Sequence, residues 1–262
     1  MGYILNQEGQ RLYYEDRGTG NAILCIHPPG MGRKVFNYQL ELSNHFRLIL
    51  PDLSGHGDSD SIKLNPKIDD FVDELLTVIN HLNIDQVLLF GYSAGGSAAQ
   101  AFALKYPERV KGLILSGAFP KVKSKLLKME FLTGMAWLKK KPDSLARILS
   151  KSHFKNERVK LEQYHHILKS DPDVWYSYYK ESLFYDCSRQ LDKLDMPMLL
   201  MYGGRAEWVN HHAPFYRECP QANLVIVEKA YHQLPATHSK AVNQSILDFF
   251  NRTYVTKDEA RA

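Results

Sequence analysis

Long apolar runs, paired cysteines and an apolar leader are all missing from this 262-residue sequence. No apolar run approaches the roughly 18 residues that a spanning helix needs, so we expect no membrane partner. The first twenty residues carry several charges and lack the apolar stretch of a secretory signal. Cys25, Cys187 and Cys219 are odd in number and far apart, which is typical of a reduced, cytoplasmic protein with buried thiols.

Motifs for metals, nucleotides and nucleic acids are absent as well. No His, Cys and Asp cluster at ligand spacing, and no Walker or dinucleotide fingerprint follows the first strand, so we expect neither metal nor organic cofactor. Residues 120–195 hold 16 Lys and Arg against 10 Asp and Glu, although the whole chain has a net charge of only +4. A solvated helical surface would explain this excess, and a preference for anionic substrates or partners is the alternative. Because no recognition motif accompanies the charge, we expect no nucleic-acid partner.

The pattern of apolar residues predicts an α/β fold. With 44% hydrophobic and 24% charged residues, the chain has the composition of a globular protein with a substantial core. Short apolar runs alternate with stretches of helical periodicity, which indicates a mostly parallel sheet covered on both faces. Lys-rich amphipathic helices interrupt this alternation, and we assign 120–195 to an inserted helical cap over the carboxyl ends of the strands. Residues 1–119 and 196–262 form the predicted core domain.

One short motif has the residues of a catalytic nucleophile. Gly91-Tyr92-Ser93-Ala94-Gly95 matches Gly-x-Ser-x-Gly and lies between a predicted strand, Val87–Tyr92, and a predicted helix, Ala94–Tyr106. The tight turn forces the serine into a strained conformation, and the flanking glycines let strand and helix approach closely. We therefore expect the Ser93 hydroxyl to stand clear of the sheet, with the Ala94 amide directed at any oxyanion formed beside it.

A serine hydroxyl needs a base, and His232 is the best placed of eleven histidines. It follows the last predicted strand, Asn223–Glu228, where the order Ser…acid…His places the base. The acid should follow the preceding strand, and the loop at 203–209 offers one carboxylate, Glu207. The less well placed alternatives are the acids Asp186, Asp192 and Asp195 and the histidines His211, His212 and His238.

Together these residues resemble the α/β-hydrolase superfamily, and specifically its members with a helical cap. The stretch Asp52-Leu53-Ser54-Gly55-His56-Gly57-Asp58-Ser59-Asp60 is similar to the family's Asp-x-x-Gly-His-Gly-x-Ser-Asp loop. Gly91 to Gly96 resembles the nucleophile elbow, and Ala230-Tyr231-His232 takes the place of Gly-x-Gly-His. The resemblance covers nearly the whole chain and implies an eight-stranded, mostly parallel sheet. It also implies Ser93 as nucleophile, His232 as base and Ala94 as an oxyanion donor.

The sequence departs from the family pattern at two places. Family members carry His-Gly-x after the third strand and use the amide of x as the second oxyanion donor, but here that residue is Pro29, which has no N–H. Gly30 or Met31 would have to donate instead. The family's acid falls on Ala206, one residue before Glu207. The serine at the elbow excludes the aspartate-dependent dehalogenases and epoxide hydrolases that the chain otherwise resembles.

The sequence thus predicts a serine hydrolase that cleaves a small carboxylic ester, thioester, lactone or amide through an acyl-enzyme. Ser93, His232 and Glu207 would form its triad, and the expected partner is a small-molecule acyl substrate selected by the cap. Two alternatives stay open. The fold also serves as a binding or signalling scaffold with slow or vestigial hydrolysis, and the same triad can support carbon–carbon bond hydrolysis or a lyase reaction.

Overall fold

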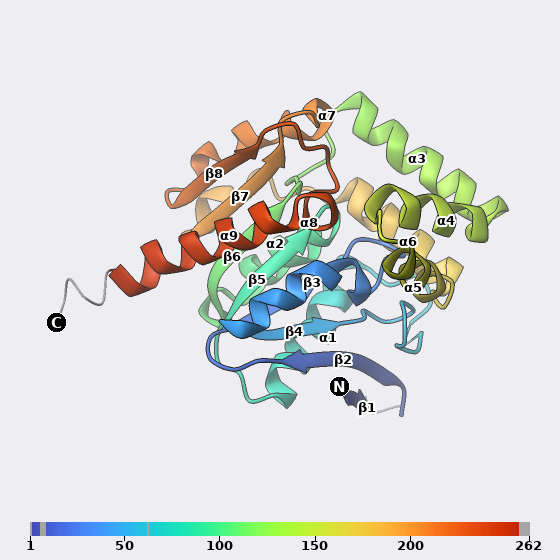
Figure 1. Ribbon diagram of the computed structural model, residues 1–262, viewed down its shortest axis with the longest axis horizontal. Coiled ribbons are helices and arrows are strands. Elements are labelled where there is room, and N and C mark those ends of the chain that lie inside the picture. Colours follow the sequence, from blue (N-terminus) through green and yellow to red (C-terminus); the bar gives the residue numbers. More distant parts are fainter. Residues whose placement is uncertain (1, 6–8, 62, 257–262) are drawn as a thin grey trace.

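The computed structural model describes residues 2–5, 9–61 and 63–256, so the outermost residues of both predicted core ranges lie outside it. Its centre is one eight-stranded sheet in the order β1-β2-β4-β3-β5-β6-β7-β8 (Figure 1). The strands are β1 (Gly2–Leu5), β2 (Arg11–Arg17), β3 (Ala22–Ile26), β4 (Arg47–Pro51), β5 (Val87–Tyr92), β6 (Val110–Ser116), β7 (Met198–Gly203) and β8 (Ala222–Val227).

The sheet is parallel except at the N-terminal edge. There β1 pairs antiparallel with β2, and β2 pairs antiparallel with β4. The remaining pairs are parallel, and every residue of β3, β5 and β7 is buried. Strands that run as unbroken apolar segments are those covered on both faces, as the sequence predicts. The predicted fold class, an eight-stranded and mostly parallel α/β sheet, is confirmed.

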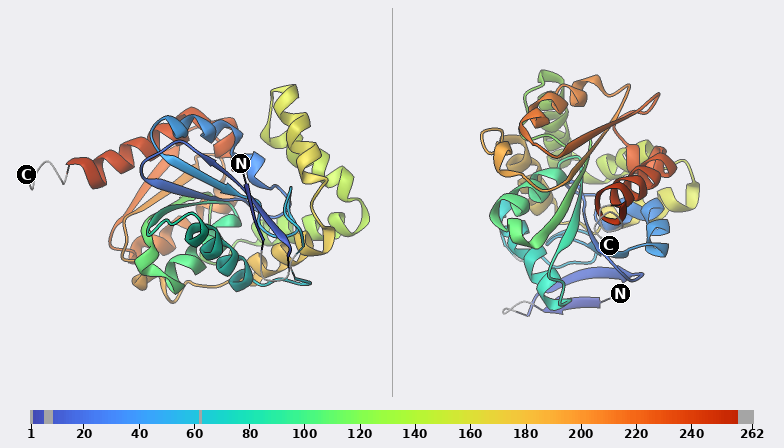
Figure 2. Two further views of the ribbon diagram at one scale, coloured as in Figure 1. Left: turned by 90° about the horizontal axis from the view of Figure 1, so that it is seen from below. Right: turned by 90° about the vertical axis from the view of Figure 1, so that its left-hand side faces the viewer.

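Successive residues of a strand point to opposite faces of the sheet, so a strand that is apolar throughout needs helices on both faces. In β3, Leu24 and Ile26 pack with α1 (Ile68–His81) and α2 (Gly95–Lys105), whereas Ile23 and Cys25 pack with η1 (Arg33–Asn44) and α9 (Ser239–Phe250) on the other face (Figure 2). The remaining short helices are η2 (Pro107–Arg109), η3 (Leu191–Lys193), α7 (Glu207–Asn210), η4 (Ala213–Glu218), α8 (Leu234–Thr237) and η5 (Asn251–Val255).

Four helices lie between β6 and β7, and we call them the cap helices. They are α3 (Lys125–Lys140), α4 (Pro142–His153), α5 (Glu157–Ile167) and α6 (Pro172–Phe184). Ser124, Asn156 and Asp171 each accept a backbone N–H at the start of the helix that follows, which explains where α3, α5 and α6 begin. The cap helices gather at one end of the molecule (Figure 1). Trp175 and Tyr178 of α6 are fully buried and line no open space, and Tyr178 packs against His27, His56 and Phe71 of the core.

Two helical stretches depart from a continuous α-helix. The stretch at 33–44 is a 3₁₀ helix with a kink at Phe36 rather than an α-helix. Residues 207–218 form two short helices, α7 and η4, with Pro214 in the first turn of η4. Proline has no N–H to continue the preceding helix, so the chain restarts there.

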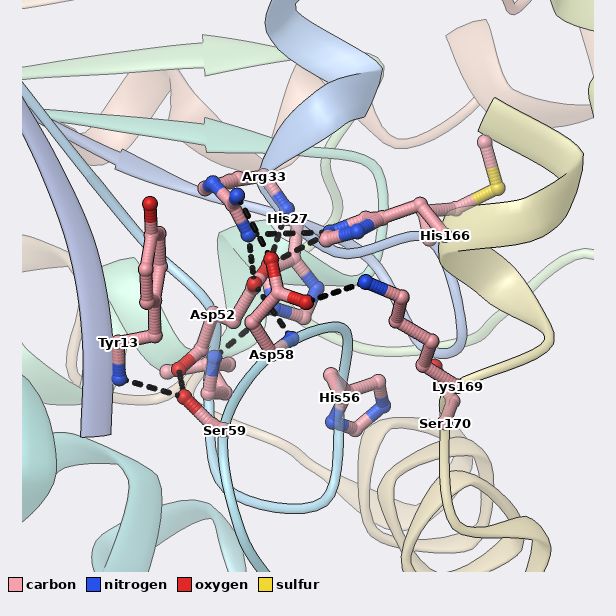
Figure 3. A network of polar contacts seen from close by, with 12 residues as sticks. Tyr13, His27, Arg33, Asp52, His56, Asp58, Ser59, His166, Lys169 and Ser170 are labelled. Atoms are coloured by element: carbon pink, nitrogen blue, oxygen red, sulfur yellow. Dashed lines mark hydrogen bonds and ion pairs between the residues drawn. The ribbon is translucent and has the colours of Figure 1, made fainter. Parts of the chain in front are cut away.

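A buried network of charges joins the cap to the core (Figure 3). The Arg33 guanidinium lies 3.0 Å from Glu15 and 2.8 Å from Asp58, and it also forms a salt bridge with Asp52. His166, from α5, lies with its Nε2 3.0 Å from the Asp52 carboxylate. Burial alone would raise the pKa of Asp52, but His166 and Arg33 beside it lower that pKa well below its ordinary value. The Asp52 carboxylate is therefore held charged in a solvent-free position.

The same network contains a group with metal-ligand character. The carboxylates of Asp52 and Asp58 and the imidazole of His166 bring ligand atoms within 4.8 Å of one another. However, the Arg33 guanidinium donates to both carboxylates, through Nη1 to Asp52 and Nη2 to Asp58. The Arg33 guanidinium thus supplies the positive charge that a metal ion would otherwise bring to the two carboxylates. The network serves as an internal ion-pair cluster.

Candidate active site

Ser93 occupies a strained turn between β5 and α2. Its φ is +52°, in the left-handed region that side-chain-bearing residues seldom adopt. The turn is held by a hydrogen bond of 2.8 Å from the Ser93 N–H to the carbonyl of Ser116 on the neighbouring strand. A Cβ at Gly95 would lie 2.2 Å from the Ile26 carbonyl oxygen, so only glycine fits where α2 meets the sheet. This is the strand–turn–helix geometry expected of Gly-x-Ser-x-Gly.

His232 is brought to Ser93 from 139 residues further along the chain. Its Nε2 lies 2.8 Å from the Ser93 Oγ, within hydrogen-bond distance. His232 follows β8 and precedes α8, and only 6% of the residue is exposed. Burial lowers the pKa of its imidazole to about 4, so the ring is neutral at pH 7 and able to accept a proton. The structure thus joins two of the three residues of the predicted triad.

Glu207, predicted to hold His232, does not do so in this structure. The Nδ1 of His232 is buried and has no hydrogen-bond partner among the described residues. Glu207 is the first residue of α7 and is exposed, while Ala206 before it is the buried residue of the loop. Because a one-residue offset turns the side chain away from the interior, the carboxylate does not reach the imidazole. Asp186, Asp192 and Asp195 do not bond to Nδ1 either.

The space beside Nδ1 is taken by backbone. Gly117 follows β6 with a φ of +60°, and a Cβ at this glycine would lie 2.7 Å from both Nδ1 and Cε1 of His232. The imidazole therefore packs directly against the Gly117 main chain. Without an acceptor on Nδ1, nothing in the described residues fixes the tautomer that presents a bare Nε2 to Ser93.

The predicted oxyanion donors differ in how their amides are used. The Ala94 N–H, at the start of α2, donates no hydrogen bond within the described part of the chain. The Met31 N–H donates to the Pro28 carbonyl at 3.2 Å and so is already engaged in the loop. The Gly30 N–H makes no such bond among the residues described. Ala94 and Gly30 are therefore the two candidates with uncommitted amides.

Ser93 and His232 lie in the wall of a cavity of about 520 Å³ beneath α3 and α4. Most of that wall is apolar, with aliphatic and aromatic side chains from α3 and α4, among them Leu127, Phe131 and Leu145. Glu130 contributes a carboxylate that accepts a hydrogen bond of 3.0 Å from the Trp208 indole. No lysine or arginine stands among the described residues that line the cavity. Such a site suits an uncharged, apolar acyl group.

Comparison with known proteins identifies the family and the fold. The model of a hydrolase family described as Serine aminopeptidase, S33 matches residues 40–236. The chain belongs to this family. The solved structure of a thermophilic esterase from Thermogutta terrifontis has the same fold as this chain, with a TM-score of 0.82. The two are 27% identical, and the match covers 96% of this chain and 98% of the esterase. The predicted membership of the α/β-hydrolase superfamily is confirmed.

Curated relatives of this α/β-hydrolase differ in how much they share with it. An uncharacterized protein of Mycobacterium tuberculosis is 34% identical over 111 residues, covering 42% of this chain. The match spans only 33% of the mycobacterial protein's own length. A 2-hydroxy-6-oxononadienedioate/2-hydroxy-6-oxononatrienedioate hydrolase of Burkholderia vietnamiensis is 27% identical over 272 residues, covering 92% of this chain and 91% of that enzyme. Among the described residues, no helix combines the length and apolarity needed to cross a membrane.

One polar pair in the cavity of this α/β-hydrolase was not predicted from the sequence. The Tyr92 hydroxyl lies 2.9 Å from Nε2 of His153, which ends α4, and both residues are buried. Nδ1 of His153 lies 2.8 Å from the Leu149 carbonyl one helical turn earlier, so both ring nitrogens are engaged. Burial lowers the pKa of His153 to about 4, which keeps the ring neutral. A histidine at a helix end carries no sequence signal that would distinguish it from a surface residue.

Proposed function

We propose that this protein is a serine hydrolase of small, mainly apolar acyl compounds. The observation that carries the proposal is the 2.8 Å contact between the Ser93 Oγ and Nε2 of His232, made from a strained turn in the wall of the capped cavity. The apolar walls support an ester, thioester, lactone or amide as substrate, with the cap at 120–195 selecting the acyl group. Three buried, unpaired cysteines support a cytoplasmic location.

The reaction follows from the positions of these groups. The Ser93 Oγ attacks the carbonyl carbon while Nε2 of His232 takes the hydroxyl proton. The oxyanion accepts hydrogen bonds from the Ala94 N–H and, we propose, from the Gly30 N–H. His232 then gives its proton to the leaving group as the bond between that group and the carbonyl carbon breaks. A water molecule, deprotonated by His232, finally cleaves the acyl-enzyme and restores Ser93.

We further propose that the base works as a pair with Ser93, without a carboxylate on Nδ1. The unpartnered Nδ1 and the exposed Glu207 support this arrangement. An imidazole whose Nδ1 donates to no carboxylate is a weaker base, and its protonated form is less stabilised. Turnover should therefore be slow for a serine hydrolase. The scaffold alternative, in which hydrolysis is vestigial, gains support from the same observation and from Pro29 at the usual donor position.

A panel of substrates tests the proposed function. We expect 4-nitrophenyl esters of short and medium chains to be hydrolysed with an initial burst of nitrophenol stoichiometric with enzyme, because acylation precedes slower deacylation. A carbon–carbon substrate, a vinylogous 1,5-diketone, should be turned over more slowly. Faster cleavage of the diketone would favour carbon–carbon bond hydrolysis, the alternative to which the Burkholderia relative points. No turnover of any compound in the panel would favour the scaffold.

The pH dependence of this reaction should be unusual. His232 must be neutral to accept the Ser93 proton, and burial lowers its pKa to about 4, so activity is lost only as the pH falls through that value. We expect kcat/KM for an aryl ester to stay nearly constant from about pH 8 down to about pH 5.5, since this ratio reports the free enzyme's base. An acid limb centred between about pH 6 and 7, as for an ordinary imidazole, would contradict the prediction.

The role of Glu207 can be decided by one substitution. We expect Glu207→Gln to change kcat by less than about twofold, since its carboxylate does not contact His232 in the structure. Glu228→Gln, at another exposed glutamate near the end of β8, is the matched control. Steady-state hydrolysis of 4-nitrophenyl butyrate is the measurement. A tenfold or larger loss in Glu207→Gln alone would restore Glu207 as the triad acid.

A further inference from the structure

The positive charge of this protein is concentrated on two cap helices. Residues 121–155, which span α3 and α4, contain ten basic side chains and two acidic ones, a net charge of +8 in a chain whose net charge is +4. The rest of the chain is therefore acidic overall. A positive electrostatic potential over one region of the surface attracts negatively charged partners.

Few of these cations are neutralised within the protein. Lys121 lies 3.6 Å from Asp186, and Arg147 lies 3.7 Å from Asp143. Lys139 lies over the Tyr176 ring, 4.3 Å from its centroid. None of the others makes an ion pair with a carboxylate in the described part of the chain: Lys123, Lys125, Lys128, Lys140, Lys141, Lys151 and Lys155. All seven are exposed. Their charges are available to a partner outside the protein.

The same helices expose large apolar side chains. Leu126 and Met129 are 64% and 61% exposed, and Leu132, Trp137 and Ile148 are also exposed. All of these except Leu132 also line the cavity that contains Ser93, so they form its rim. Water-exposed apolar side chains grouped around the mouth of a cavity indicate a surface that is covered in use.

The position of the lysines indicates which partner covers it. No lysine lines the cavity, so the cationic groups do not recognise a substrate held against Ser93. They lie on the same two helices as the apolar rim, and exposed apolar side chains on helices rich in lysine match the boundary between acyl chains and anionic head groups. A nucleic acid would use the lysines but leave the exposed Leu, Met and Ile side chains without a partner.

We propose that the rim of α3 and α4 docks on the surface of an anionic lipid bilayer. Leu126, Met129, Trp137 and Ile148 enter the acyl boundary, and the exposed lysines of the same two helices lie against the head groups. The cavity then opens toward the lipid, from which an acyl substrate can enter. We expected no membrane partner because the sequence has no membrane-spanning segment. Docking on the bilayer surface does not require such a segment. The docking itself does not depend on the proposed hydrolysis.

Vesicle binding by the full chain tests the docking, without substrate. We expect the protein to sediment with vesicles of phosphatidylcholine and phosphatidylglycerol, and at least about tenfold less with phosphatidylcholine alone or in high salt. Lys128→Glu, Lys140→Glu and Lys141→Glu combined should weaken binding to the anionic vesicles by about tenfold or more. The control combines Lys193→Glu, Arg217→Glu and Lys240→Glu, which changes the net charge equally at exposed positions outside α3 and α4, and should bind as wild type.

Tryptophan fluorescence gives a second readout that does not depend on charge alone. Trp137 lies on the rim and Trp175 is fully buried, while Trp208 is half-buried with its indole bonded to Glu130 of α3. Vesicle binding should therefore shift the emission of Trp208→Phe to shorter wavelength and leave Trp137→Phe combined with Trp208→Phe unshifted. Absence of binding to anionic vesicles would overturn the proposal. So would equal losses in the two triple variants, an unshifted Trp137, or tight binding to single-stranded RNA with none to vesicles. Hydrolysis of a soluble ester, measured separately, distinguishes a failure of docking from a failure of the proposed function.

Discussion

Replacing Ser93 by alanine should lower kcat for 4-nitrophenyl butyrate by about 10⁴-fold or more. In the proposed mechanism the Ser93 Oγ forms the acyl-enzyme, and it lies 2.8 Å from Nε2 of His232. Without it, His232 can at best activate a water molecule in the same cavity. The residual rate would come from binding and from the oxyanion donors. Stopped-flow and steady-state measurements should show the burst lost together with the turnover.

A second serine in the cavity wall provides the control for this prediction. Ser152 lines the same cavity, but its Oγ bonds to the Leu149 carbonyl on its own helix and not to His232. Ser152→Ala should keep the burst that Ser93→Ala loses. If Ser93→Ala retains more than about a tenth of the wild-type kcat, another group carries the reaction and the assignment of the nucleophile is wrong.

Replacing Arg33 by methionine should lower the free energy of unfolding by about 3–5 kcal/mol. The side chain of Arg33 is only 6% exposed, and it compensates Asp52, which is fully buried. Glu15 and Asp58 keep Arg17 and Lys169 as ion-pair partners, but the buried Asp52 carboxylate loses its guanidinium. Methionine fills much of the same volume, so the loss reports the uncompensated charge rather than a cavity. Urea unfolding followed by circular dichroism is the measurement.

An exposed salt bridge offers the matched comparison. Arg11 pairs with Asp60 at 3.1 Å, but the two side chains are 57% and 37% exposed. Solvent screens such a pair, so Arg11→Met should destabilise the protein far less than Arg33→Met. Similar losses in the two variants would mean that the network around Asp52 adds no stability beyond a surface ion pair. Because His166 joins this network from α5, Arg33→Met should also loosen the cap, seen as faster amide exchange in α5.

Where the chemistry is local, the sequence was sufficient to predict the structure. The run of glycines around Ser93 forces a tight turn between an apolar strand and a small-residue helix, and the structure has that turn. His232 could be chosen from eleven histidines because the strand order of the fold fixes where a base must follow the last strand. The first prediction rests on residues adjacent to Ser93, and the second on the position of His232 just after the last strand.

Where the outcome depends on packing between distant segments, the sequence was not sufficient. Glu207 was the one acid in its loop, but a short helix begins at that residue and leaves its side chain exposed. The loop that follows β3 engages the Met31 amide internally, which no residue pattern indicates. Likewise, the Asp52 stretch suggested a family loop but not that His166, 114 residues away, would bond to it.

Covalent labelling of the native protein tests the central claim most directly, namely that Ser93 is a nucleophile activated by His232. After reaction with a fluorophosphonate and proteolysis, mass spectrometry should find the phosphonyl adduct on the peptide containing Ser93. Labelling should become much slower in His232→Ala, because the hydroxyl then has no base. An adduct on any other residue, no adduct at all, or an unchanged labelling rate in His232→Ala would contradict the account.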